Sequence, residues 1–562
     1  MILNLPVGER NMTFNIFRKL KSIGVNISLV SALAFALGFT QISDAATLPE
    51  LPRSFMSTTY APPTGKTITV NAGGNFQAAL NNAKLGDTIV LQAGATFTGP
   101  FTLPNKTSGS GWIYIRSSAY ASLPPPGSRV SPADAANMPK IIINEGGGSA
   151  IQTAPQSHHF RFVGIEFKPV AGKFVYSLVT IGNRDTSHET LPHDIIFDRC
   201  IVRGDLVKGG RRGIAISGMR IAVIDSHVSG FFEAGADSQA LWGYQGNGPV
   251  KIVNNFLEAA SENIMFGGAD PTIPNSVSAD IEIRRNHFFK PLSWIGAGLN
   301  VKNLLEFKNA ERVLVEGNIF ENCFLDGQAG FAIIITPRNQ DGKAPWSITQ
   351  DITIRLNKFI NLGSGIALAG RDGNYPLVST VTKRLLVENN VIEVTRLGNA
   401  DGRIFQITGG PIDVTVRHNT GFTPSTGNAV LSFTENPIKS DQFDFRDNIL
   451  SNGVTGFDGT GTGTGTNALN RYFTNYTFTK NAIIGGSDKY PSGNFFPPNN
   501  AAVGFVNVAA GDYKLAAGSA YRNAASDGKD LGADIAALNA ALAGDQPAAR
   551  TEQKNAATNP KK

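Results

Sequence analysis

The sequence predicts an all-β fold: a right-handed parallel β-helix, a solenoid of about ten or more coils with a short N-terminal capping helix. One strand–turn unit, usually marked by Asn, recurs from Cys200 to Asn481 at intervals of 27 to 39 residues. Each unit alternates apolar and polar residues over four or five positions, and no helical stripe of ten residues accompanies it. The 61 glycines indicate many tight turns.

The repeated unit has the form apolar-x-apolar-x-x-Asn-x-apolar. Its Asn occurs in segments such as VLVEGNIF and ITIRLNKF, at positions 255, 286, 318, 357, 390, 419, 448 and 481. Cys200 and His227 align with the same slot upstream. At a tight turn Asn can adopt left-handed geometry, and stacked side-chain amides can bond to one another from coil to coil. We therefore expect a structural Asn ladder, with neighbouring strands about 4.8 Å apart.

The predicted β-helix domain covers residues 66–535. Residues 76–83 form an amphipathic helix that precedes a first strand in the segment GDTIVL. The segments GDYKL (511–515) and DGKDLG (527–532) are typical of a closing coil, and residues 536–562 are expected to form a short helix and a disordered tail. Residues 47–65 are interpreted as a linker. The Gly–Thr run 459–466 is expected to be a flexible loop with no helix after it.

Residues 1–46 have the pattern of a secretory signal peptide. Arg18, Lys19 and Lys21 precede an apolar stretch at 23–39, and Ser-Asp-Ala at 43–45 provides a small-x-small cleavage site. A transmembrane anchor is the alternative, but the stretch is barely long enough and holds several polar residues. We expect a secreted, periplasmic or cell-surface protein with no membrane contact after cleavage.

The composition limits the partners and cofactors. Apolar residues make up 41% of the chain, and the formal net charge of +6 comes from scattered basic residues, so we expect no nucleic-acid partner. The two cysteines, Cys200 and Cys323, are interpreted as small buried residues. No spacing typical of a zinc, haem or iron–sulfur site occurs, so no metal ligands are assigned.

One coil carries charge in the groove that the strands between the Asn turns should form. In LLEFKN (304–309), Leu305 and Phe307 point inward, so Glu306 and Lys308 point outward. Small or neutral residues are expected outward on the other coils, at Thr180, Ala215, Ser217, Gly267, Thr336, Ala369, Gln406 and Thr408. These small neighbours should leave room for a ligand at Glu306 and Lys308.

Further polar and aromatic residues gather at the ends of these strands. They are Asp237, Trp242, Tyr244, Gln245, Glu262, Asp270, Lys302, Arg338, Arg371 and Glu435, with Trp294 and Trp346 nearby. Indole faces suit sugar rings. The loop TPRNQDGKAPW, which follows the strand at 332–335, is an insertion beside Glu306 and Lys308, and such loops are where sites tend to be built.

Two catalytic chemistries fit these residues. A glycoside hydrolase needs two carboxylates about 5 to 9.5 Å apart, and Glu262 and Glu306 could supply them across neighbouring coils. A uronate lyase needs a cation to neutralise the substrate carboxylate and a base to remove the adjacent ring proton. Lys308 and Arg338 match that chemistry, although a neighbouring carboxylate at Glu306 is expected to favour the charged form of Lys308 and so to oppose a free amine.

The segment GDTIVLQAGATFTGPFTLPNK, the central coils and GDYKL together resemble the pectin lyase-like superfamily of right-handed parallel β-helices over residues 66 to about 535. That superfamily includes lyases, hydrolases, esterases, epimerases and adhesins. LLEFKNAERVLVEGN, followed by the strand that ends at Arg338, is similar to the chondroitinase B/alginate lyase type. This resemblance implies Lys308 as the base, Arg338 as its helper, and Glu262 and Glu306 in a region that could hold Ca²⁺.

Three hypotheses follow. The first is a polysaccharide lyase acting on a uronate-containing polysaccharide, with Lys308, Arg338 and Glu306 as catalytic residues. Its substrate-binding residues are assigned as Glu262, Arg371, Tyr244, Trp242 and Asp270. The second is a glycoside hydrolase using Glu262 and Glu306. The third is a non-catalytic carbohydrate-binding surface protein. In each case the partner is a polysaccharide and the chain is expected to be a monomer.

Overall fold

The computed structural model describes residues 46–183, 185–373, 377–433 and 438–543. The predicted signal peptide, apart from residue 46, and the predicted tail beyond residue 543 lie outside the described residues. Within the described ranges, no helix combines the length and the apolar character needed to cross a membrane.

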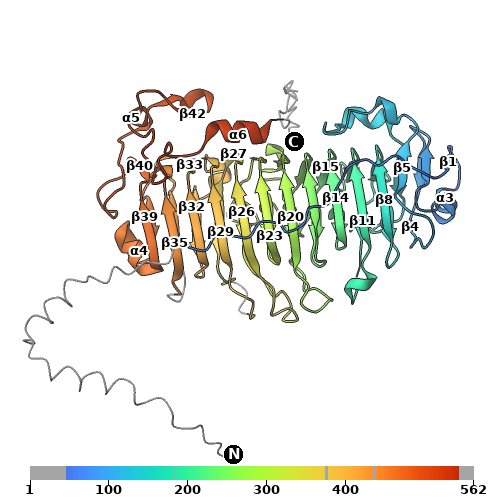
Figure 1. Ribbon diagram of the computed structural model, residues 1–562, viewed down its shortest axis with the longest axis horizontal. Coiled ribbons are helices and arrows are strands. Elements are labelled where there is room, and N and C mark those ends of the chain that lie inside the picture. The colour runs from blue at the N-terminus through green and yellow to red at the C-terminus, as the bar shows by residue number, and fades with distance from the viewer. Residues whose placement is uncertain (1–45, 184, 374–376, 434–437, 544–562) are drawn as a thin grey trace, which may run out of the picture. The chain divides into compact units, whose positions relative to one another are not determined.

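Three long sheets make up the fold, and successive strands of each sheet are parallel (Figure 1). We call them sheets 1, 2 and 3. Sheet 1 contains β1 (Thr67–Val70), β2 (Thr88–Leu91), β5 (Ile113–Ser117), β8 (His158–Val163), β11 (His193–Asp198), β14 (Met219–Ile224), β17 (Val250–Val253), β20 (Ser278–Arg284), β23 (Ala310–Glu316), β26 (Thr349–Arg355), β29 (Lys383–Glu388), β32 (Ile412–Arg417), β35 (Ser440–Arg446) and β39 (Phe473–Thr479).

Sheet 2 contains β4 (Phe101–Leu103), β7 (Ile151–Thr153), β10 (Val179–Ile181), β13 (Arg212–Ile216), β16 (Gln239–Gly243), β19 (Glu262–Phe266), β22 (Leu305–Phe307), β25 (Phe331–Ile335), β28 (Ser364–Ala369), β31 (Phe405–Thr408), β34 (Val430–Phe433), β37 (Phe457–Gly459) and the antiparallel β38 (Gly463–Thr464). Sheet 3 contains β3 (Thr96–Thr98), β6 (Lys140–Ile143), β9 (Glu166–Pro169), β12 (Ile201–Arg203), β15 (His227–Phe231), β18 (Phe256–Ala259), β21 (His287–Phe289), β24 (Ile319–Glu321), β27 (Lys358–Leu362), β30 (Val391–Val394), β33 (Thr420–Phe422), β36 (Ile449–Ser451) and β40 (Ala482–Ile484).

Each coil contributes one strand to each sheet, and this confirms the predicted parallel β-helix. The inward side chains of the three sheets form one continuous core that runs from Val70 to Tyr490. Identical residue types stack along it, as in the column Phe288, Phe320 and Phe359, whose ring centroids are 4.5 and 4.7 Å apart. Both cysteines are fully buried and unpaired, so they fill space in this interior.

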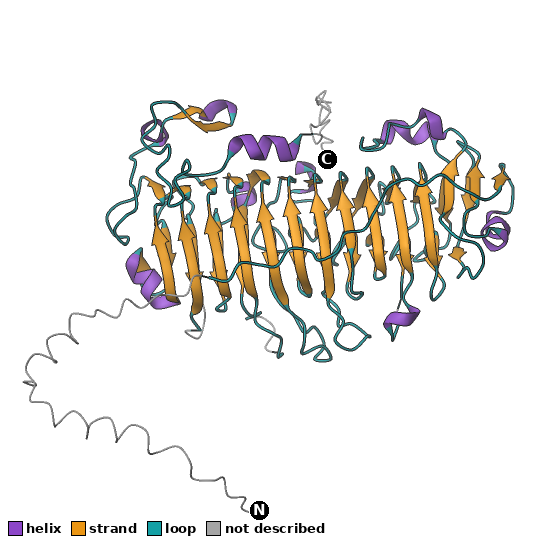
Figure 2. Ribbon diagram, viewed as in Figure 1, coloured by secondary structure: helices purple, strands orange, loops and turns teal. Residues whose placement is uncertain are grey.

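Short helices lie at both ends of the sheets (Figure 2). The predicted capping helix is α3 (Phe76–Asn82), which buries Phe76 and Leu80 against the first coils and is capped by Asn75. At the other end, α4 (Thr466–Tyr472) buries Ala468 and Leu469 against the last coil. The expectation that no helix follows the Gly–Thr run was therefore wrong, because α4 is needed to cover that end of the core.

The remaining elements belong to the C-terminal segment and to the turns. They are α5 (Asn500–Val503), the hairpin β41 (Phe505–Asn507) and β42 (Asp512–Leu515), α6 (Ile535–Leu542), and the 3₁₀ helices η2 (Tyr120–Ser122), η3 (Pro132–Asn137), η4 (His188–Thr190), η5 (Leu292–Trp294), η6 (Leu397–Asn399) and η7 (Val508–Ala510). Ile535, Leu538 and Leu542 of α6 pack on Ile319 and Val391 at the outside of sheet 3.

The Asn ladder runs through the turn between sheets 1 and 3. The side-chain oxygen of Asn318 accepts hydrogen bonds from the backbone N–H of Asn286 at 2.9 Å and from its side-chain amide at 3.0 Å. The same pair of bonds links Asn318 to Asn357, and it recurs up to Asn481 and then Asn494. Every ladder amide is thereby satisfied in the interior, which is the condition for burying it.

Two details of the ladder differ from the sequence interpretation. Ser226, not His227, occupies the slot above Asn255, because the backbone N–H of Ser226 donates to the Asn255 oxygen at 2.9 Å. The left-handed residue is the one before each ladder Asn, as at Arg285 and Leu356 with φ of 53° and 55°. The Asn side chain must point into the turn to bond the next coil. The residue before it therefore adopts the left-handed conformation that turns the chain.

The N-terminal segment interpreted as a linker lies across the outer face of sheet 1 (Figure 1). We call residues 46–61 the strap. Its backbone N–H groups donate to carboxylates of the sheet, at 2.9 to 3.0 Å: Thr47 to Asp413, Glu50 to Asp351 and Arg53 to Asp280. Three extended residues span about 10 Å, which equals two strand spacings. The strap therefore meets a carboxylate on every second coil.

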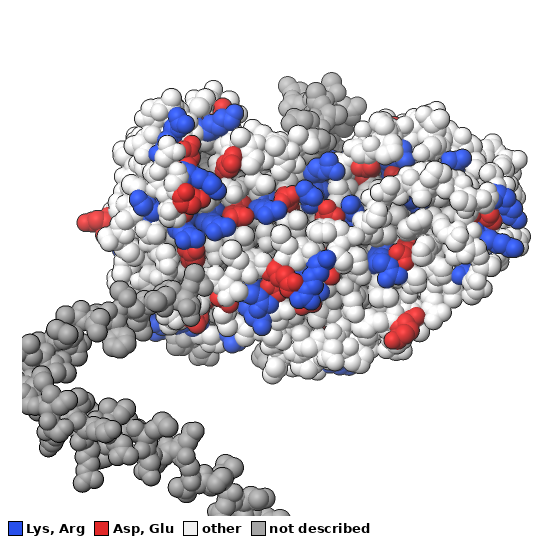
Figure 3. All heavy atoms as spheres, viewed as in Figure 1, with Lys and Arg blue, Asp and Glu red and all other residues white. Residues whose placement is uncertain are grey.

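Arginines occupy the coils between these carboxylates. Arg384 pairs with Asp351 at 2.6 Å, and Arg312 pairs with Asp280 at 2.8 Å. All four residues are left-handed, with φ from 51° to 55°. Figure 3 shows Lys and Arg beside Asp and Glu in rows across this face. The alternating charges thus hold the strap and neutralise one another.

We predict that Asn318→Ala lowers the free energy of unfolding by about 3 kcal/mol, because it leaves buried partners in two neighbouring coils without hydrogen bonds. Denaturant unfolding followed by circular dichroism measures this loss. Asn467→Ala is the matched control, since Asn467 is exposed on α4, and it should change stability by less than about 0.5 kcal/mol. If the two variants had equal free energies of unfolding, the ladder hydrogen bonds would not stabilise the fold.

Candidate functional site

The outward face of sheet 2 has a central column of side chains in register. From coil to coil it consists of Thr102, Gln152, Thr180, Ala215, Trp242, Met265, Glu306, Ile334, Ala367, Gln406 and Leu431. Leu305 and Phe307 point into the core, as predicted, so Glu306 faces outward. On the last coil Asp458 follows Leu431 in register, so Glu306 is the charged member of the column away from that end.

The space around the charged pair is smaller than the sequence suggested. Lys308 does lie beside a small residue, because a side-chain carbon on Gly267 would come within 2.7 Å of its Cβ. Glu306, however, is flanked in register by Met265 and Ile334. Glu306 and Lys308 are only 2% and 3% exposed, and they form an ion pair with each other.

A bulge in β19 brings a second carboxylate to this face. The consecutive N–H groups of Asn263 and Ile264 both donate to the carbonyl of Leu304, at 3.1 and 3.2 Å. Two residues of β19 therefore oppose the single residue that precedes β22, which shifts the side-chain alternation at the start of β19. Glu262, which precedes the bulge, is fully buried and accepts a 2.7 Å hydrogen bond from Gln239.

A buried lysine supports the turn that leads into Glu262. The ammonium of Lys290 donates to the carbonyls of residues 259, 260 and 261 at 2.7 to 2.9 Å, and to the Asn263 side chain at 3.2 Å. Burial lowers the pKa of Lys290 to about 8, although nearby carboxylates oppose that shift. Four acceptors around one cation fix the backbone at the position where Glu262 emerges.

Lys302 completes a group that we call the buried charge cluster: Glu262, Glu306, Lys302 and Lys308. The ammonium of Lys302 lies 2.6 Å from Asp237 and 3.7 Å from Glu262. One oxygen of Glu262 and one of Glu306 have no hydrogen-bond partner among the described residues. Two buried carboxylates with unsatisfied oxygens are costly unless a ligand or a proton satisfies them.

The two carboxylates of the cluster have opposite pKa shifts. Burial and the charge of Glu306 raise the pKa of Glu262 to about 7, against the opposing effect of Lys302. Burial also acts to raise the pKa of Glu306, but the charge and hydrogen bond of Lys308, followed by Arg338, lower it more, and the net shift is downward. Near neutral pH, Glu262 is thus a potential proton donor beside an ionised Glu306.

Arg338 lies on the coil after Lys308. Its backbone N–H donates to the carbonyl of Lys308 at 3.0 Å, and its guanidinium pairs with Asp372 at 2.5 Å. Arg371 precedes this aspartate, is exposed, and donates to the carbonyl of Gly409 at 3.1 Å. The structure therefore places Glu262, Glu306, Lys308 and Arg338 together, with Arg371 one coil further.

Asp270 holds the inserted loop. Its carboxylate accepts hydrogen bonds from three backbone N–H groups, those of Gln340, Asp341 and Lys343, at 2.6 to 2.9 Å. Arg338 is the third residue of this loop, two positions before Gln340. Asp270, assigned to substrate binding from the sequence, thus fixes the path of the chain beside Arg338.

The aromatic residues of the site form a stack with an arginine. The guanidinium of Arg212 lies 3.9 Å from the ring centroid of Trp242, and the Trp242 and Tyr244 rings are 4.9 Å apart and nearly parallel. The indole N–H of Trp242 donates to the carbonyl of Gly267 at 3.0 Å. Arg212 therefore covers one indole face, and it brings a cation next to Gln239 and Glu262.

Calcium does not fit the cluster in this arrangement. The ion is bound by about six to eight oxygen ligands. Here the ammonium groups of Lys302 and Lys308 lie beside the carboxylates that would coordinate it. The lysines already neutralise Glu262 and Glu306, and a cation between them would be repelled.

Sequence reasoning missed Arg212 and Lys290. Arg212 is the second residue of an Arg–Arg pair at the start of β13, and Lys290 is a single basic residue after β21. Both patterns are those of ordinary exposed cations. Their roles depend on partners one coil away, the indole of Trp242 and the carbonyls before Glu262. The neighbouring residue types gave no signal of these contacts.

No family model matches the sequence, and no curated protein matches it. Solved structures do resemble the fold. A mannuronic acid-specific polysaccharide family 6 lyase from human gut microbiota is 13% identical and superposes with a TM-score of 0.51, over 78% of this chain and 92% of that one. The family 6 alginate lyase AlyGC is 12% identical, with a TM-score of 0.48 over 76% of this chain and 53% of that one.

The pectate lyase Pel9A is 12% identical, with a TM-score of 0.34 over 84% of this chain and 96% of that one. At such identities a likeness establishes the fold and not the reaction. The chain is thus a right-handed parallel β-helix, and a polysaccharide lyase is among the solved structures that share this fold.

Proposed function

We propose that this protein is a secreted polysaccharide lyase that cleaves a uronate-containing polysaccharide by β-elimination. The observation that carries the proposal is the buried charge cluster, which brings two carboxylates and two ammonium groups together on the outward face of sheet 2. Burying the charges of Glu262, Glu306 and Lys308 beside the half-buried Lys302 is unfavourable for stability alone, and perturbed buried groups are typical of functional sites.

β-Elimination makes three demands on the protein. A base takes the proton from the carbon next to the uronate carboxylate, the bond to the neighbouring glycosidic oxygen breaks, and a carbon–carbon double bond forms. The leaving oxygen takes a proton. Cations or hydrogen-bond donors must stabilise the carboxylate while negative charge develops on it.

The cluster and its neighbours can meet these demands. Lys308 is the base: as a neutral amine it takes the ring proton, and the ionised Glu306 beside it stabilises the ammonium that forms. Arg338 and Lys302 supply positive charge beside Glu306, as their lowering of its pKa indicates. Glu262, protonated near neutral pH, is a donor for the substrate carboxylate or the leaving oxygen.

A glycoside hydrolase is the second candidate, and a specific observation favours it. Glu262 and Glu306 have pKa values shifted in opposite directions, which is the pattern of a general acid beside an ionised carboxylate. The two reactions leave different products. A lyase creates an unsaturated uronate that absorbs ultraviolet light, whereas a hydrolase creates reducing ends without that absorbance.

We predict that the mature protein generates ultraviolet-absorbing products from at least one member of a panel of alginate, pectate and glycosaminoglycans. Lys308→Arg preserves the charge opposite Glu306, but a guanidinium gives up its proton far less readily than an ammonium and cannot become a neutral base. Activity should therefore fall by about 100-fold or more. Both readouts, absorbance and reducing ends, are followed together.

Lys173→Ala, a change at an exposed lysine, is the control and should retain full activity. Circular dichroism and thermal unfolding verify that each variant is folded. Undiminished activity of Lys308→Arg would contradict the role of Lys308. Reducing ends without absorbance would favour the hydrolase, and the absence of both products would favour a carbohydrate-binding protein.

We further predict a pH dependence of stability that belongs to Glu262. In the folded protein its proton is retained up to about pH 7, whereas in the unfolded chain it leaves near the ordinary value of 4.5. The unfolded state therefore binds fewer protons in this window, and the free energy of unfolding falls as pH rises through it, by up to about 3 kcal/mol.

Glu262→Gln should remove this fall, because the amide mimics the protonated acid at every pH. Denaturant unfolding at several pH values across the window measures the difference. Glu145→Gln, at an exposed position, should keep the slope of the unmodified protein. If Glu262→Gln keeps that slope as well, the carboxyl is not held protonated by its surroundings.

A further inference from the structure

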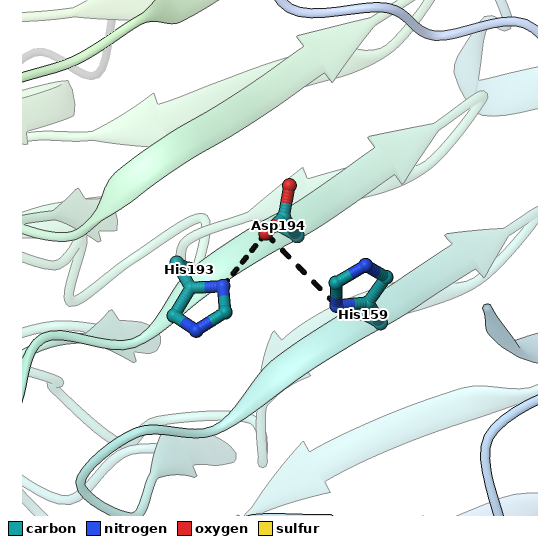
Figure 4. A group of neighbouring side chains, drawn as sticks. All are labelled: His159, His193 and Asp194. Atoms are coloured by element: carbon teal, nitrogen blue, oxygen red, sulfur yellow. Dashed lines mark hydrogen bonds and ion pairs between the residues drawn. The ribbon is translucent and has the colours of Figure 1, made fainter. Parts of the chain in front are cut away.

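Three histidines and one aspartate meet on the outer face of sheet 1, away from sheet 2 and its charge cluster. His158 and His159 begin β8, and His193 and Asp194 begin the neighbouring β11. Figure 4 shows the rings of His159 and His193 on either side of the Asp194 carboxylate. We call these four residues the histidine cluster.

The donor atoms of the cluster lie within coordination range of one another. One oxygen of Asp194 is 2.6 Å from Nδ1 of His193 and 3.9 Å from Nδ1 of His159, and one donor atom from each of the three residues lies within 4.8 Å of the others. Ligand atoms around a tetrahedral zinc ion are about 3.4 Å apart. The two measured distances bracket that value, so shifts below about 1 Å would place all three donors on one ion.

His158 offers a further nitrogen. Its Nε2 lies 2.9 Å from the carbonyl oxygen of Lys106, and a carbonyl can only accept, so Nε2 carries the proton. Nδ1 of His158 then has a lone pair, and it lies 2.8 Å from Nδ1 of His159. A histidine whose remote nitrogen is fixed by a carbonyl is in the state typical of a metal ligand.

The protonation states also suit a cation. Burial is the main cause that lowers the pKa of both His158 and His159, so these rings are neutral near pH 7. Burial acts to raise the pKa of Asp194, but hydrogen bonds from His193 and Arg220 outweigh it and lower the pKa to about 2. Neutral imidazoles with one carboxylate are the ligand set preferred by zinc and its neighbours, not by calcium or magnesium.

Asp194 departs from the other carboxylates that face the strap. Asp280, Asp351 and Asp413 each accept a hydrogen bond from a backbone N–H of the strap. Asp194 instead contacts the side chains of His193, His159 and Arg220. A cavity of about 530 Å³ opens here between the strap and the sheet, and Asp194, Arg220 and Trp112 line it. An ion can therefore reach the carboxylate.

We propose that His159, His193 and Asp194, with His158 as an additional nitrogen, form a binding site for a divalent transition-metal ion of the zinc class. Arg220 is the competing cation in the metal-free protein. Its guanidinium holds Asp194 at 2.7 Å and approaches Nδ1 of His193 at 2.9 Å, and its side chain is 41% exposed. An exposed side chain can swing into solvent when a metal ion replaces its charge.

The test is a calorimetric titration of the mature, untagged protein with Zn²⁺. We expect one ion per chain, and His159→Ala and His193→Ala should each weaken binding at least about tenfold, since even outer-shell changes weaken metal sites by that factor. Arg220→Met removes the competing charge and should tighten binding by about tenfold. His188→Ala, at a histidine of η4 outside the cluster, should leave binding unchanged.

A second readout is local to the cluster. The Trp112 ring lies 5.1 Å from the His159 ring, so Cu²⁺ at the site should quench part of the tryptophan fluorescence, and Trp112→Phe should abolish that part. Circular dichroism verifies the fold of each variant. The proposal is overturned if neither the unmodified protein nor Arg220→Met binds Zn²⁺, or if both histidine variants bind as well as the unmodified protein.

Discussion

The vertical bonds between identical turns hold the whole fold in register. Each ladder Asn bonds the N–H and the amide of the Asn before it, so a coil can match its neighbours in one alignment only. A slip of one residue would turn every core side chain outward. Because the ladder sets which residues face inward, it also sets which residues of sheet 2 face outward. The outward position of Glu306, in register with Met265 and Ile334, follows from it.

The charge cluster exists because the regular pattern is broken beside it. A strictly alternating β19 would not place Glu262 on the outer face, and the bulge at Asn263 and Ile264 does so. The bulge in turn depends on Lys290, whose ammonium binds the carbonyls of the turn that would otherwise be buried without partners. Stability and chemistry are thus linked at this coil. Lys290 supports the backbone, while Lys302 and Lys308 neutralise the carboxylates.

The sequence predicted what repeats and missed what does not. The coil period, the capping helix and the inward positions of Leu305 and Phe307 follow from local patterns, and the structure confirms them. The slot of Ser226 was misassigned by one residue because His227 aligned equally well by residue type. The bulge, the cation over Trp242 and the burial of Lys290 arise from contacts between coils, and no spacing along the chain encodes these.

The strap follows the repeat from the outer face of sheet 1, because its N–H groups bind carboxylates at regular intervals. Three residues of extended chain match two coils, so aspartates on alternate coils bind its N–H groups and arginines on the coils between brace those aspartates. Two coils beyond Asp280 the corresponding residue is Arg220, so the alternation of aspartates ends there. Arg220 pairs with Asp194 on the next coil, beside a cavity and three histidines. Where the sheet and the strap lose this match, side chains hold the carboxylate in place of the strap's N–H groups. A cation can then replace the arginine without disturbing the core.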